Sequence, residues 1–199
     1  MQPAYYEDFN EIKKKIWLML DDAITNRASQ FRIPTFICGN QSDFDGRIVV
    51  LRKSDQHNNI VQFHSDIRSD KIEKLNSNNR ASLIFYDKEE KIQVRAKVEC
   101  TVNHKNEVTE QSWLKTAHIS RKCYLVDNGP GTESVEPTSG LKPEKDNFDY
   151  TMEESEKGYE NFTVIQCKVK SFEWLYLAAK GHRRARFDLE NDKRVWLVP

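Results

Sequence analysis

The sequence predicts a mainly β protein with flanking helices, in which antiparallel strands form a small barrel and the helices pack outside it. Strand-like apolar runs are separated by short turns rich in Gly, Asn, Asp and Ser. Such short connections favour antiparallel pairing, because parallel neighbours need a long crossover. Helical patterns are few and lie between or beside the strands, so the helices flank the sheet instead of alternating with it.

Length and composition predict a single domain over residues 1–199. The 31 basic and 31 acidic residues cancel, so no overall field favours nucleic acid or an acidic membrane surface as a partner. No apolar run is long enough to span a membrane, and the N-terminus lacks the apolar core of a signal peptide. Four scattered cysteines without a C-x-x-C pair indicate reduced thiols and no metal site, so we expect a cytoplasmic protein.

The N-terminal segment, residues 1–30, is expected to form one amphipathic helix over 7–26. Ile12, Ile16 and Leu20 recur at every fourth position, which places them on one face of a helix. Lysines and aspartates occupy the opposite face. This helix is therefore expected to lie on the outside of the barrel with its apolar face against the strands.

Strand-like runs occupy most of the remaining chain. Rich in β-branched and aromatic residues, they are Thr35–Cys38, Arg47–Arg52, Ile60–His64, Ala81–Tyr86, Ile92–Val102, Phe162–Leu177, Arg183–Leu189 and Arg194–Val198. A short helix, Ser69–Leu75, is inserted between two of them, and a longer helix is expected over 106–125. Residues 127–160 are rich in Pro, Gly, Ser and acidic residues, and they form either a mobile surface loop or a lid over a functional site.

One strand ends in a pattern that can hold an anion. The run VQFHSDIRSDKIEKL, residues 61–75, stops on His64 and Ser65 and opens the next helix with Ser69 and Lys71. A helix N-terminus presents unpaired N–H groups and the positive end of the helix dipole, and hydroxyls and an ammonium add further donors for a phosphate. The alternative is a solvated strand–helix turn in which Ser69 only caps the helix.

Basic residues elsewhere allow two interpretations each. Arg47 and Arg52 bracket the apolar stretch IVVL, and either both cap a strand with solvated charge or Arg47 adds its charge to the anion site. Gln93, within an apolar strand, is either an outward-facing residue or a ligand contact. The run HRRARF, residues 182–187, is either a surface paired with the acidic residues that follow it or a binding cluster.

Five segments, taken in order, carry a resemblance to a known family. They are RIVVLR at 47–52, FHSDIRSDK at 63–71, NNRASLIF at 78–85, IQVRAKVE at 92–99 and HRRARF at 182–187, before a terminal W-x-V-P. Over residues 30–199 the chain resembles the pyridoxamine 5'-phosphate oxidase-like family of FMN-binding split barrels. The resemblance implies a six- to eight-stranded antiparallel split β-barrel and a homodimer with FMN at the subunit interface.

The resemblance also implies roles for individual residues. The FMN phosphate would be held by Arg47, Ser65, Ser69 and Lys71. The remaining cofactor contacts would come from Val49, Val50, Arg52, His64, Gln93, Tyr176 and Arg186. Of these, Gln93 would reach the flavin ring from the neighbouring subunit. His182 and Arg184 take the places of residues that face the substrate in the oxidases.

Two departures separate the chain from the vitamin oxidases themselves. Asp70 stands where they carry a second phosphate-binding arginine, and the substrate-phosphate grip of their helix is not reproduced in residues 113–124. The chain therefore resembles the uncharacterised FMN-binding relatives, which implies an FMN-dependent oxidoreductase acting on an unknown small-molecule substrate. Two alternatives are a non-catalytic protein that binds or stores flavin or another anionic cofactor, and a ligand-free interaction domain.

Overall fold

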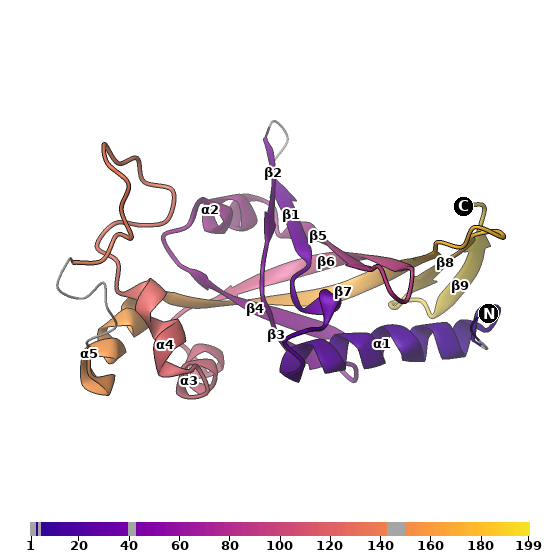
Figure 1. The fold of residues 1–199 in the computed structure, drawn as a ribbon, viewed down its shortest axis with the longest axis horizontal. Helices are drawn as coiled ribbons and strands as arrows, with labels where there is room; N and C mark the ends of the chain where they lie inside the picture. Colours follow the sequence, from indigo (N-terminus) through magenta and orange to yellow (C-terminus); the bar gives the residue numbers. More distant parts are fainter. Residues whose placement is uncertain (1–2, 4, 40–42, 143–149) are drawn as a thin grey trace.

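The computed structural model describes residues 3, 5–39, 43–142 and 150–199. Their strands form one nine-stranded antiparallel sheet in the order β2-β1-β5-β6-β7-β4-β3, to which β8 adds beside β7 and β9 beside β8 (Figure 1). The strands are β1 (Thr35–Gly39), β2 (Phe44–Ile48), β3 (Leu51–Asp55), β4 (Ile60–Asp66), β5 (Arg80–Asp87), β6 (Ile92–Asn103), β7 (Phe162–Tyr176), β8 (Arg183–Asp188) and β9 (Lys193–Leu197).

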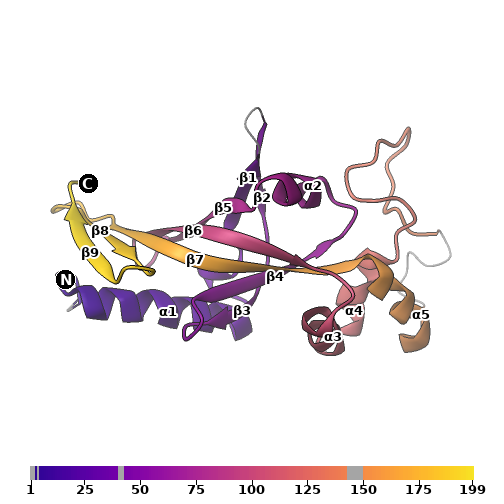
Figure 2. The ribbon, with the colours of Figure 1, turned by 180° about the vertical axis from the view of Figure 1, so that it is seen from behind.

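The sheet is strongly curved but open, which confirms the predicted antiparallel split barrel with flanking helices. β6 and β7 are its longest strands, and they pair along most of their length (Figure 2). β2 and β3 form the two ends of the main strand path, and among the described residues no ladder joins them. The apolar side chains inside the curve are fully buried, as Phe36, Phe63 and Phe172 illustrate.

The single strand predicted over Arg47–Arg52 is two strands, so the sheet has nine strands and not six to eight. The chain leaves β2, which pairs with β1, and enters β3, which pairs with β4. Between them the Val49 N–H donates to the carbonyl of Pro34 at 3.1 Å. Within the stretch IVVL, Val49 and Leu51 are buried, whereas Ile48 is 61% exposed, so only part of the crossing lies in the interior.

Helix α1 (Phe9–Thr25) confirms the predicted amphipathic N-terminal helix. The Asp8 carboxylate caps it by accepting from the backbone N–H groups of Asn10 and Glu11. Its buried face includes Ile12, Ile16 and Leu20, and it lies against β3 on one side of the sheet (Figure 1). In the described part of the chain, no helix combines the length and apolar character needed to cross a membrane.

The helix predicted over 106–125 is interrupted. The structure has α3 (Glu107–Leu114), then α4 (His118–Arg121) and a 3₁₀ turn, η2 (Lys122–Tyr124). The buried Arg121 guanidinium donates to the carbonyls of Trp113 at 2.9 Å and Thr116 at 3.2 Å, and it lies 4.5 Å from the Trp113 ring centroid. A continuous helix would use these carbonyls for its own hydrogen bonds, so Arg121 stabilises the break.

The segment 127–160 is only partly the polar loop that its composition predicts. Residues 127–142 contain neither helix nor strand, and residues 143–149 lie outside the described part. Helix α5 (Met152–Glu156) and the 3₁₀ turn η4 (Lys157–Asn161) then follow. A capping box between Thr151 and Glu154 starts α5, which explains an ordered helix in so acidic a stretch.

Candidate functional site

A cavity of about 280 Å³ opens where β2 ends and β3 begins. Its lining residues are Arg47, Ile48, Val49, Val50, Arg52, His64, Lys71 and Tyr124. All except Ile48 and Tyr124 are residues that the sequence analysis assigns to a cofactor. The crossing between β2 and β3, the end of β4 and the start of helix α2 (Asp70–Ser77) therefore converge on one cavity.

Lys71 is the buried cation of this cavity, with 8% of its surface exposed. Its Nζ donates to Ser65 Oγ at 2.8 Å and to Ser69 Oγ, and both hydroxyls belong to buried residues. Among the described residues no carboxylate lies within ion-pair distance of this ammonium, and its burial lowers the pKa of Lys71. A buried charge with only neutral partners favours the binding of an anion.

Ser69 does not cap α2 with its side chain, which was one of the two interpretations of the sequence. It occupies the N-cap position of α2, yet its side chain makes no capping hydrogen bond. Its hydroxyl instead accepts a hydrogen bond from Lys71. The start of α2 is therefore arranged around the lysine ammonium, and the predicted grouping of Ser65, Ser69 and Lys71 is present in the fold.

Arg47 reaches the same region but is held by carboxylates. Its Nη1 and Nη2 donate to the two carboxylate oxygens of Asp70 at 2.8 and 3.1 Å, and Nη2 also contacts Asp45. The hydrogen bonds from Arg47 lower the pKa of Asp70. The Arg47 Nε is buried and has no hydrogen-bond partner among the described residues. The Nε–H group is therefore a buried donor that a ligand could use.

His64 and Arg52 also line a second cavity, of about 470 Å³. The second cavity is lined by Ile24, Arg27, Arg52, Lys53, Gln62, His64, Val108, Gln111, Ser112, Lys115, Thr116, Ala117, Ile119, Ser120 and Gln166. Among the described residues, its lining includes cationic side chains and neutral amides and hydroxyls but no carboxylate. The described lining of the two cavities therefore favours anions.

The other predicted cofactor and substrate residues do not line the first cavity. Gln93 lies opposite Leu175 in the β6–β7 ladder, and Tyr176 ends β7 with its ring 5.0 Å from that of Tyr6. His182 and Arg184 border a separate cavity of about 580 Å³ beside the C-terminal segment.

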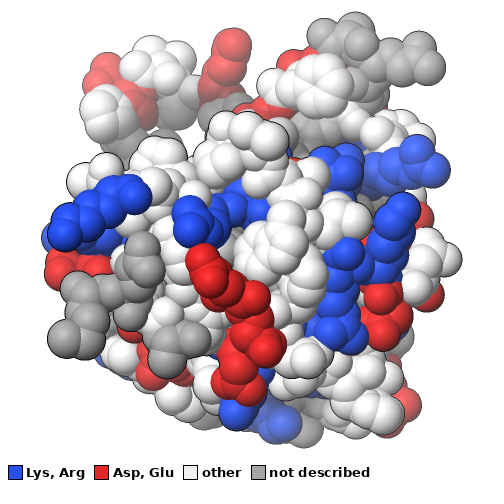
Figure 3. Space-filling view, turned by 90° about the vertical axis from the view of Figure 1, so that its right-hand side faces the viewer, with Lys and Arg blue, Asp and Glu red and all other residues white. Residues whose placement is uncertain are grey.

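Arg184 and Arg186 extend from β8 toward the Glu173 carboxylate on β7. Arg184 Nη2 lies 2.6 Å from a Glu173 oxygen, and Arg186 Nη2 lies 3.6 Å from the other. On the face at the β8–β9 end of the molecule, basic and acidic side chains lie interspersed (Figure 3). The partner of Arg184 and Arg186 is thus Glu173, which precedes the run, and not the acidic residues that follow it.

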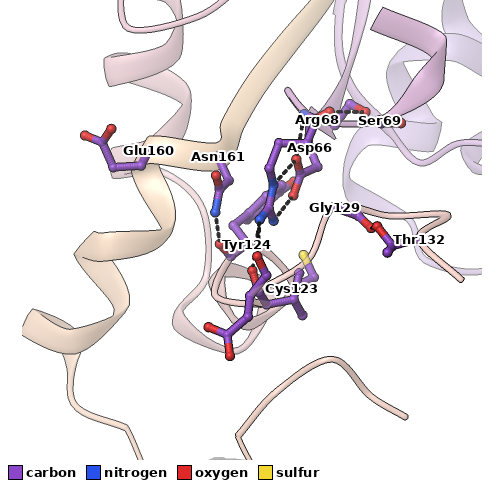
Figure 4. Close-up of polar contacts among 12 residues, drawn as sticks. Asp66, Arg68, Ser69, Cys123, Tyr124, Gly129, Thr132, Glu160 and Asn161 are labelled. Carbon is purple, nitrogen blue, oxygen red and sulfur yellow. Dashed lines mark hydrogen bonds and ion pairs between the residues drawn. The ribbon is translucent and has the colours of Figure 1, made fainter. Parts of the chain in front are cut away.

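A clamp that the sequence analysis did not identify fixes the chain next to Ser69 (Figure 4). Arg68 Nε and Nη2 donate to the Asp66 carboxylate at 3.0 and 2.8 Å, and Nη1 donates to the carbonyls of Val126 and Asp127 at 3.1 Å each. A Cβ at Gly129 would lie only 2.9 Å from Arg68 Cβ, so the loop requires glycine there. Arg68 therefore ties the end of β4 to the segment after η2.

Two solved structures share this fold along the whole chain. A pyridoxamine 5'-phosphate oxidase-related, FMN-binding protein from Nostoc punctiforme is similar with a TM-score of 0.68 at 15% sequence identity, covering 100% of both chains. PhzG from Burkholderia lata, in complex with tetrahydrophenazine-1-carboxylic acid, is similar with a TM-score of 0.73 at 15% identity, covering 100% of this chain and 98% of its own. None of the curated proteins matches the chain.

The family model described as pyridoxamine 5'-phosphate oxidase, FMN-binding domain, matches residues 14–104. The chain has the fold of the pyridoxamine 5'-phosphate oxidase family. This finding confirms the resemblance drawn from the five sequence segments. The matched range contains every residue of the Arg47, Ser65, Ser69 and Lys71 grouping.

Tyr124 is the cavity residue that sequence reasoning missed in this oxidase-family fold. It lies in η2, and burial raises the pKa of its phenol. Its backbone carbonyl accepts from Asn161 Nδ2 at 2.9 Å, which fixes the turn against the start of β7 (Figure 4). The predicted continuous helix over 106–125 gave no signal that this ring would turn toward the cavity.

His64 is expected to stay neutral throughout the physiological pH range. Burial of the ring, with a smaller effect of Arg52, lowers its pKa from 6.5 to about 3. Between these values the unfolded chain binds more protons than the folded one, so stability falls as pH decreases below about 6.5. Between about pH 6.5 and 5, the unfolding free energy of the His64→Gln variant should therefore fall by about 1.5 kcal/mol less than that of the wild-type protein.

Urea unfolding of both proteins across this range, with NMR titration of the His64 ring, measures the effect. A His64 resonance that titrates near the pKa of free histidine would contradict the assignment.

Proposed function

We propose that the chain is an FMN-binding flavoprotein and an oxidoreductase. The observation that carries the proposal is the buried Lys71 ammonium, which is held by Ser65 and Ser69 hydroxyls without a carboxylate in ion-pair distance among the described residues. A phosphate monoester is an anion that uses such donors together with a helix N-terminus. The unpaired Arg47 Nε adds a further donor beside them.

The residues present fit this cofactor. Lys71, Ser65, Ser69 and Arg47 would hold its phosphate. Val49, Val50, Arg52 and His64 would line the remainder of the cofactor site. When bound, FMN supplies hydride and electron transfer. At a pKa of about 3 the His64 imidazole is a weak base, so its role would be to accept and donate hydrogen bonds and not to remove a proton.

The proposal includes a homodimer. Gln93, Tyr176 and Arg186, which the resemblance assigns to the flavin ring, do not line the cavity that contains Lys71. A second copy of the chain would bring these residues to the site, and a cofactor between two subunits would be better shielded from water. Localisation in the cytoplasm is part of the same proposal, and it is supported by the composition and the free thiols.

The second cavity supports a small anionic substrate. Arg27, Arg52, Lys53 and Lys115 contribute positive charge to it, and it adjoins the proposed flavin position through Arg52 and His64. Positive charge without carboxylates attracts carboxylate or phosphate groups. The carboxylic acid in the PhzG complex is a ligand of this charge type.

Replacing Lys71→Met should weaken FMN binding by about a hundredfold, because the charge-assisted hydrogen bonds to the phosphate are lost. Riboflavin, which lacks the phosphate, should change by less than about threefold on the same scale. Lys14→Met is the control, because Lys14 is exposed on α1 and is not among the residues that line either cavity. Flavin fluorescence titration measures all affinities, and equal losses for FMN and riboflavin would contradict phosphate binding by Lys71.

The oxidoreductase part of the proposal is tested by anaerobic mixing of the FMN-loaded protein with NADH or NADPH. The flavin absorbance should bleach and then return when oxygen is admitted. Lys115→Gln should raise the half-saturating nicotinamide concentration by about threefold or more, since the second cavity loses one charge. Lys88→Gln, at an exposed site outside both cavities, is the control. Failure of both reductants to bleach the flavin would favour a binding or storage protein instead.

A further inference from the structure

We propose that Asp70 is an internal competitor for the phosphate position and sets how strongly the site prefers FMN over riboflavin. This inference rests on the proposed function. It concerns a specificity-determining residue in the first turn of α2, which pairs with Arg47, a lining residue of the cavity. Its basis is the arrangement of three carboxylates and two cations beside Lys71.

The Asp70 carboxylate occupies two groups that a phosphate would use. One oxygen accepts from Arg47 Nη1 at 2.8 Å and from the backbone N–H of Lys71 at 2.8 Å. The other accepts from Arg47 Nη2 at 3.1 Å. The carboxylate thus accepts from a guanidinium and from a backbone N–H in the first turn of α2. A phosphate oxygen at a helix N-terminus would use the same two kinds of donor.

The surrounding charges leave Lys71 as the cation outside this network. Arg47 contacts Asp45 and Asp70, and Lys74 Nζ lies 2.8 Å from Asp43 and 3.7 Å from both Asp45 and Asp70. Arg47 is thus shared between two carboxylates, and Asp70 is the one that also accepts from the Lys71 N–H. A phosphate entering beside Lys71 would be repelled by the charge of Asp70, whereas riboflavin would not.

Asp70 can yield to a phosphate because it is close to solvent. Its side chain is 55% exposed, whereas that of Arg47 is 25% exposed. Turning the carboxylate outward would return it to water and free Nη1 of Arg47, while Nη2 would keep its contact with Asp45. The cost of breaking this pair would be subtracted from the binding energy of the phosphate, so native Asp70 lowers the affinity for FMN without closing the site.

The test is the ratio of FMN to riboflavin affinity in the full-length protein and in Asp70→Asn. Asparagine keeps a side-chain oxygen for the Lys71 N–H but removes the charge that holds Arg47. Asp70→Asn should bind FMN about tenfold more tightly, because the Asp70 charge no longer competes with the phosphate for Arg47. Its affinity for riboflavin should stay within about twofold of the wild-type value. Glu73→Gln is the matched control, since it removes a negative charge from an exposed position of α2 without touching Arg47.

The possible results separate this inference from the proposed function. A higher FMN-to-riboflavin ratio in Asp70→Asn but not in Glu73→Gln supports the competitor role. An unchanged ratio with clear FMN binding would overturn the inference and leave the proposed function standing. An equal rise in both variants would attribute the effect to general charge and would also overturn it. Absence of FMN binding in every variant would overturn the proposed function and this inference together.

Discussion

The burial of the Lys71 ammonium on two serine hydroxyls is the interaction on which the candidate site depends. Removing an ammonium from water costs several kcal/mol, and neutral hydroxyls return only part of this. The cost is tolerated because β4 delivers Ser65 and the start of α2 delivers Ser69 to the same nitrogen, at 2.8 Å from the first hydroxyl. The electrostatic potential around the Lys71 ammonium is therefore positive, which favours the binding of an anion.

The rest of the fold holds this junction in place. β4 pairs with β7 along its whole length, and the Asp66–Arg68 clamp binds the chain immediately before Ser69 to the carbonyls after η2. Tyr124, at the end of η2, lines the cavity from that side. Val49 and Val50, where the chain passes from β2 to β3, also line the cavity. Arg121 stabilises the helix break that precedes η2 and Tyr124, because it donates to the carbonyls of Trp113 and Thr116.

The sequence predicts those parts of the fold that local patterns determine. Apolar spacing locates α1, and turn residues delimit most strands. The sequence does not predict the crossing at Val49–Val50, because an apolar run is equally expected in a strand and in a crossing between two strands. The break in the helix over 106–125 depends on Arg121, whose partners are set by tertiary structure.

The same distinction applies to the site. The motif around Ser65, Ser69 and Lys71 is local, and the structure brings these residues together as predicted. Asp70 is recognisable in the sequence as a departure from the oxidases, but its pairing with Arg47 across 23 positions is a property of the folded chain. Gln93, Tyr176 and Arg186 do not line the cavity around Lys71, so their predicted roles depend on the proposed second subunit and stay predictions.

A crystal structure of the protein with FMN tests the central claim most directly. The account predicts the phosphate within hydrogen-bond distance of Lys71 Nζ and of the Ser65 and Ser69 hydroxyls, at the N-terminus of α2. It also predicts the flavin ring beside the crossing between β2 and β3. FMN bound with its phosphate elsewhere, while Lys71 keeps only its two serine partners, would contradict the account.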